Sequence, residues 1–129
     1  MKVQIDHTSR AHALLSPSSS HRWLNCTPSA RLEEPYEITS SAAAEEGTLA
    51  HELAEHAIEK YLAGEYLPLL DELPVPDEIR INKYYSSEME HYVTDYVCYV
   101  CDIYELEEGA KMSIERKFDL TAYVPECFG

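Results

Sequence analysis

This 129-residue chain contains few positively charged residues. Only 10 lysines and arginines stand against 24 aspartates and glutamates, which gives a formal net charge of −14 at pH 7. A chain with this balance repels a phosphate backbone unless metal ions or a basic region elsewhere compensate for it. We therefore expect the chain alone to bind DNA weakly, and most of its carboxylates to form a solvated surface.

Long apolar runs are also absent. No stretch approaches the roughly 18 apolar residues of a membrane span, and the first residues, MKVQIDHTSRAH, contain no apolar core of a signal peptide. We expect a cytoplasmic protein without a membrane partner. The hydrophobic content of 45% and the 10 tyrosines predict a folded domain rather than a disordered chain.

Cysteine is limited to Cys26, Cys98, Cys101 and Cys127. Without an export signal, these are expected to be reduced thiols rather than a disulfide framework. Cys98 and Cys101 form a C-x-x-C pair, but no second pair completes a zinc site. We therefore interpret them as half-buried core residues.

The clearest element that the sequence does contain is an amphipathic helix over residues 41–64. Its apolar residues recur at the i, i+3, i+4, i+7 spacing of one helical face. They are Leu49, Ala50, Leu53, Ala54, Ala57, Ile58, Tyr61 and Leu62. Ser40 or Ser41 can cap the helix and Gly64 can end it. Gly47, one turn before His51, leaves the backbone uncovered, so another group can approach closely there.

The polar face of this helix carries a histidine and a carboxylate. His51 and Glu55 lie one turn apart, about 40° from each other around the axis, so they can share a cation or form an ordinary exposed pair. A zinc-protease H-E-x-x-H site is excluded on geometry, because His51 and His56 lie about 140° apart around the helix.

Two further segments have recognisable periods. Residues 77–107 have the helical period and predict a second long helix that stops near Gly109, with its tyrosines packed in the core rather than free to stack on bases.

Residues 111–124 alternate between apolar and polar side chains, which predicts one strand or hairpin. The 129 residues are thus expected to be mainly α. A lone strand is no stable sheet, so its partners are expected after Gly129 or in another chain.

Two motifs occur in the order found in a known group of nucleases. The sequence GTLAHELAE, from Gly47 to Glu55, resembles the first motif of the RecB-like branch of the PD-(D/E)XK nucleases, where a glycine precedes a metal-binding histidine on a helix. The sequence LSPSSSHRWLNCTPSARL, from Leu15 to Leu32, resembles the N-terminal segment of an uncharacterised phage-associated family in that branch.

This resemblance implies a metal-dependent DNA nuclease, an exonuclease of the phage recombination or repair type. It implies an α/β, restriction-endonuclease-like fold for a complete protein, of which residues 1–129 would be the N-terminal portion of a single nuclease-like domain. His51 and Glu115 would bind Mg²⁺ or Mn²⁺, with Glu55 as the second choice of carboxylate.

In that branch, a G-x-x-D and a D/E-x-K sequence follow the strand that carries the glutamate. Here the chain stops at Gly129, before the positions where those motifs are expected. We therefore expect a truncated chain that is inactive alone, whose partner is DNA or the missing C-terminal half. Its catalytic residues beyond the metal ligands stay unassigned.

Some RecB-like nucleases also hold an iron–sulfur cluster through a cysteine followed directly by proline and three later cysteines. Thr27 separates Cys26 from Pro28 here and no later triplet follows, so we expect no cluster. The alternative to a nuclease is a non-catalytic helical module that binds a protein partner through its acidic surface and tyrosine-rich helix.

Overall fold

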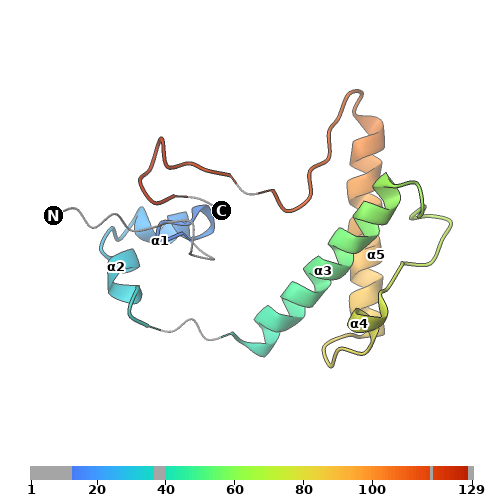
Figure 1. Ribbon diagram of the computed structural model, residues 1–129, viewed down its shortest axis with the longest axis horizontal. Coiled ribbons are helices and arrows are strands. Elements are labelled where there is room, and N and C mark those ends of the chain that lie inside the picture. Colours follow the sequence, from blue (N-terminus) through green and yellow to red (C-terminus); the bar gives the residue numbers. More distant parts are fainter. Residues whose placement is uncertain (1–12, 37–39, 117, 128–129) are drawn as a thin grey trace. The chain divides into compact units, whose positions relative to one another are not determined.

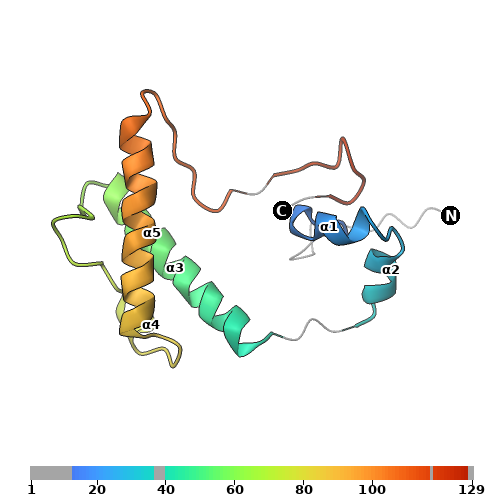
Figure 2. The same ribbon diagram turned by 180° about the vertical axis from the view of Figure 1, so that it is seen from behind.

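The computed structural model describes residues 13–36, 40–116 and 118–127, which belong to two compact units. One unit is Ser40–Glu115, and the other comprises the described residues of Met1–Thr39 and Arg116–Gly129. The elements in chain order are η2 (Pro17–Ser19), α1 (Ser20–Trp23), α2 (Ser29–Glu33), α3 (Ala42–Leu62), α4 (Asp77–Arg80) and α5 (Ser87–Leu106). Figures 1 and 2 show them from opposite sides. The described residues are therefore mainly α-helical, and none of their helices is long and apolar enough to cross a bilayer.

Helix α3 forms where the apolar period predicts it. Ser41 has an extended backbone and its Oγ accepts a hydrogen bond from the backbone N of Ala44 at 3.1 Å, so the helix begins at Ala42. Gly64 follows the helix with φ of 75°, a conformation that glycine adopts without a steric penalty. The buried residues of α3 all belong to the predicted apolar face: Leu49, Leu53, Ala54, Ala57 and Ile58. The prediction of this helix is confirmed.

Helix α5 begins later than the sequence predicts. The predicted helix over 77–107 is divided into α4 and α5, and Ile81, an apolar residue between them, is exposed. Asn82 Oδ1 accepts a hydrogen bond from the backbone N of Tyr84, and Ser86 Oγ accepts one from that of Met89 at 3.1 Å. The side chains of Asn82 and Ser86 accept hydrogen bonds from backbone N–H groups that a continuous helix would pair with its own carbonyl groups. The helix is therefore interrupted here, and α5 begins at Ser87 with Ser86 as its N-cap.

Helices α3 and α5 run in the same direction and pack against each other (Figures 1 and 2). Near their C-terminal ends the rings of Tyr61 and Tyr104 meet edge to face, with centroids 6.3 Å apart. Because the two helices are parallel, the chain must travel back from the end of α3 to the start of α5, and residues 63–86 form this connection. That connection adds Tyr66, Leu73 and Ile79 to the buried core, in which Leu53 and Val97 are the largest fully buried side chains.

Three tyrosines of α5 lie outside this core. The buried residues of α5 follow one another every fourth position as Met89, Val93, Val97 and Cys101. Tyr92, Tyr96 and Tyr99 lie beside that line and expose 64%, 53% and 65% of their surface. The prediction that these tyrosines pack in the core is therefore wrong.

The predicted strand over 111–124 is also wrong for the described residues of that range. They form loop and turns, apart from a single-residue bridge at Asp119. The alternation has another cause, because Met112 and Ile114 are half-buried against the helical core while Ser113 and Glu115 are exposed. Two residues two positions apart can reach one apolar surface from an extended loop as well as from a strand.

Several polar contacts link the segments of the unit that contains α1 and α2. Trp23 Nε1 donates a hydrogen bond to the backbone oxygen of Ser16 at 2.9 Å. Arg22 pairs with Glu33, and Arg31 pairs with Glu126 at 3.1 Å. The second pair connects α2 with the C-terminal segment, although exposed ion pairs of this kind stabilise a fold only slightly.

The C-x-x-C cysteines of α5 are structural. Cys101 is buried, and that burial raises the pKa of its thiol to about 11. Burial also raises the pKa of Cys98, whose Sγ lies 3.7 Å from the backbone oxygen of Pro68. Both thiols are therefore protonated at neutral pH, which suits core residues better than metal ligands or nucleophiles.

Tyr66 provides a test of the core. Its side chain is buried, and its hydroxyl has no hydrogen-bond partner in the part of the chain that the structure describes. Because an unpaired buried hydroxyl is costly, we expect Tyr66→Phe to leave the free energy of unfolding unchanged or to raise it by up to about 1 kcal/mol. Urea denaturation followed by circular dichroism measures this. Tyr85→Phe is the control, because the Tyr85 hydroxyl donates to Glu90 and its loss should cost about 1 kcal/mol. An equal loss in both variants would contradict the expectation.

Candidate functional site

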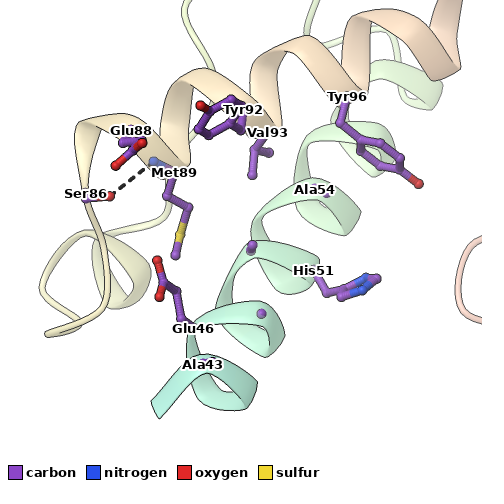
Figure 3. Close-up of a pocket in the computed structure, with 12 residues that line it drawn as sticks. Ala43, Glu46, His51, Ala54, Ser86, Glu88, Met89, Tyr92, Val93 and Tyr96 are labelled. Carbon is purple, nitrogen blue, oxygen red and sulfur yellow. Dashed lines mark hydrogen bonds between the residues drawn. The ribbon is translucent and has the colours of Figure 1, made fainter. Parts of the chain in front are cut away.

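His51 lies on the polar side of α3, and its side chain is 80% exposed. Leu53 and Ala57 are fully buried against α5 and fix the rotation of the helix about its axis. Figure 3 shows the imidazole extending from α3 away from α5. The packing of the apolar face thus holds the histidine toward solvent, where a ligand can reach it.

The loop that follows α5 brings Glu115 to this histidine. Met112 and Ile114 pack on the helical core and fix the loop, and Glu115 follows with a φ of 45°, which is uncommon for a residue other than glycine. Its Oε1 lies 3.9 Å from Nδ1 of His51, and its side chain is 66% exposed. The structure therefore brings together the two residues that the nuclease resemblance pairs, although Glu115 comes from a bend and not from a strand.

Glu55, the other candidate carboxylate, occupies the same region without pairing with His51. It is half-buried one turn further along α3, and no ion pair joins it to His51 within the described residues. Both residues line a cavity of about 210 Å³ together with Glu115. The other lining residues are Ala54, Ile58, Tyr96, Val100, Met112, Ser113 and Ile114. Two carboxylates and one imidazole thus face one small space with an apolar wall.

The spacing of His51 and Glu115 can be compared with that of two ligands on one ion. Ligands about 2.1 Å from an octahedral metal are about 3.0 Å apart when adjacent and about 4.2 Å apart when opposite. The observed 3.9 Å between Nδ1 and Oε1 matches neither the adjacent nor the opposite separation. No group of three or more His, Cys, Asp or Glu side chains suited to a metal occurs in the described part of the chain. His51 and Glu115 therefore supply two neighbouring donors whose exposed side chains would have to turn toward an ion, with water or other groups as the remaining ligands.

A second pair of histidine and carboxylate, on α5, provides a comparison for His51 and Glu115. His91 Nε2 lies 3.6 Å from Asp95 Oδ2, and both side chains are well exposed. These residues are one turn apart on α5, so their proximity follows from helix geometry alone. His51 and Glu115 come from separate segments beside a cavity. The His91 pair is therefore a suitable control.

An open groove between α3 and the N-terminal half of α5 adjoins this site (Figure 3). Its volume is about 670 Å³, and His51, Ala54 and Tyr96 line both the groove and the smaller cavity. The remaining lining residues are Ala43, Glu46, Gly47, Ala50, Ser86, Glu88, Met89, Tyr92 and Val93. No sequence pattern predicts the groove, although the uncovered backbone at Gly47 predicts a close approach on this face.

Comparison with known proteins identifies a family but no structural relative. No solved structure matches this chain. Residues 12–129 match the family described as protein of unknown function (DUF2800), and the match spans nearly the whole chain. The chain therefore belongs to DUF2800, a family of proteins whose function is unknown.

Proposed function

We propose that this chain forms part of a metal-dependent nuclease site of the RecB-like PD-(D/E)XK type, in which His51 and Glu115 bind one Mg²⁺ or Mn²⁺. The observation that carries the proposal is the 3.9 Å approach of these two side chains from separate segments. The motif GTLAHELAE supports it independently, because the resemblance assigns a metal-binding role to the same histidine.

The residues of the site have separable roles. His51 offers an imidazole nitrogen and Glu115 a carboxylate oxygen, a mixed pair that favours Mn²⁺ over Mg²⁺. Glu55 lines the same cavity, and in this proposal it holds a water molecule or completes the ligand set. In phosphodiester hydrolysis a bound divalent ion neutralises charge and stabilises the leaving oxygen.

Charge restricts how such a site can meet DNA. Ser40–Glu115 contains 18 acidic residues and 4 lysines or arginines, whereas the rest of the chain contains 6 of each. The helical unit therefore carries the whole net charge of −14 and repels phosphates. The proposal thus needs metal ions and a basic surface outside Ser40–Glu115 to bring DNA to the site. It also implies that the complete nuclease domain has the α/β, restriction-endonuclease-like fold.

Manganese binding tests the proposal. Titration of the protein with Mn²⁺, followed by electron paramagnetic resonance of the free ion, should reveal a site that His51→Ala and Glu115→Gln each weaken about tenfold or more. Both side chains are exposed, so the variants should unfold at nearly the same urea concentration as the wild type. We expect this chain to bind the ion without cleaving DNA, because two donors are fewer than such hydrolysis needs.

His91→Ala is the matched control, since it removes a similarly exposed histidine that also faces a carboxylate. It should leave Mn²⁺ affinity unchanged. Manganese affinity that responds equally to His51→Ala and His91→Ala, or to neither, would contradict the proposed site.

A further inference from the structure

The groove between α3 and α5 has a floor made of very small side chains. Ala43, Gly47, Ala50 and Ala54 recur along α3 at the spacing of one helical face. A Cβ atom added at Gly47 would meet nothing within 4 Å. A glycine inside a helix costs about 1 kcal/mol relative to alanine, and no contact within the described residues explains that cost. The floor is therefore shaped for a group that comes from outside this unit.

The wall of the groove is largely apolar, and only some of its side chains are buried in the fold. Met89 and Val93 are buried, whereas Tyr92 and Tyr96 present more than half of their surface to solvent. Figure 3 shows Val93 pointing toward α3 and Tyr96 lying beside Ala54 at one end of the groove. Two parallel helices with such a surface offer the same ridges and grooves that a third helix uses to pack. Small residues on the floor let the backbone of that helix come close.

The charge around the groove decides what kind of helix it accepts. Glu46 and Glu88 are among its lining residues, and no lysine or arginine is. The unit around it carries 18 acidic residues and only 4 basic ones, so a second copy of the chain and a nucleic acid are both repelled. A helix with lysines or arginines beside its apolar ridge complements this surface.

We propose that the groove between α3 and α5 binds a basic amphipathic helix of a partner protein. The apolar ridge of that helix lies over Gly47 and Ala50 against Tyr92 and Tyr96, and its lysines or arginines pair with Glu46 and Glu88. The inference does not depend on metal binding at His51 and Glu115, so either can fail without the other.

The test uses the whole chain in EDTA and a fluorescein-labelled peptide of about five helical turns, with leucines at i, i+3, i+4 and i+7 spacing and lysines on both flanks. Fluorescence anisotropy should show binding that weakens more than tenfold in Gly47→Leu. This variant should fold at least as stably as the wild type, because leucine favours a helix more than glycine and its Cβ has space. The double variant Glu46→Lys with Glu88→Lys should also lose more than tenfold in affinity.

Glu59→Lys with Glu72→Lys is the matched control, because it changes the net charge equally at exposed positions that do not line the groove. It should lower the affinity less than threefold. The proposal is overturned if the peptide does not bind, if Gly47→Leu binds it as well as the wild type, or if both double variants lose affinity equally. It is also overturned if sedimentation shows a dimer that Gly47→Leu dissociates, or if single-stranded DNA displaces the peptide from the groove.

Discussion

Leu53→Ala is expected to lower the free energy of unfolding by about 3 kcal/mol, which is a large share of the stability of a small domain. Leu53 has no exposed surface and lies in the centre of α3, at its contact with α5. Its truncation removes apolar contacts and leaves a cavity that the two helices can close only by shifting against each other. Urea denaturation followed by circular dichroism at the helical band measures the loss.

Leu106→Ala is the control for this prediction. Leu106 is the last residue of α5 and is 83% exposed, so the same chemical change should alter stability by less than about 0.5 kcal/mol. A loss in Leu53→Ala no larger than that in Leu106→Ala would mean that α3 and α5 do not share the packed core described above.

The sequence predicts α3 well because three independent signals agree over it. The apolar period, the cap at Ser41 and the stop at Gly64 all indicate the same boundaries, and the structure has them. The second long segment lacks this agreement. Its apolar period continues through Ile81, but the local hydrogen bonds of Asn82 and Ser86 interrupt the helix. Here capping overrides periodicity.

The strand prediction fails for a different reason. The alternation of Met112 and Ile114 with polar residues indicates only that every second side chain is buried. A loop that lies on a helical core buries every second side chain as well as a strand in a sheet does. The exposed tyrosines of α5 are a related case. Helical spacing places Tyr92, Tyr96 and Tyr99 near the apolar line, but only the position of the neighbouring helix decides which of them are covered.

The candidate site could be predicted from the sequence only through its resemblance to the RecB-like nucleases. No local pattern relates His51 to Glu115, because their proximity depends on the path of the loop after α5 and on the packing of Ile114. Glu55 is the partner that helical spacing alone suggests, yet the ion pair in the described residues is with Glu115. Whether these residues bind metal stays a prediction.

Ala57→Leu and Ala50→Leu are expected to have opposite consequences, although they make the same change two turns apart on α3. Ala57 is fully buried at the contact with α5, so the larger side chain has no space and should destabilise the fold by about 2 kcal/mol. Ala50 is only partly buried and lines the groove, where a leucine side chain can extend into open volume.

Because alanine and leucine have similar helix propensities, Ala50→Leu should change the free energy of unfolding by less than about 0.5 kcal/mol while it fills the proposed binding surface. The measurement is the urea midpoint of both variants beside the wild type, together with their affinity for the basic peptide. Ala50→Leu should keep its stability and lose peptide affinity. If it instead destabilises the chain as much as Ala57→Leu does, then α3 and α5 are closed together at Ala50 and the free chain has no groove for a third helix to enter.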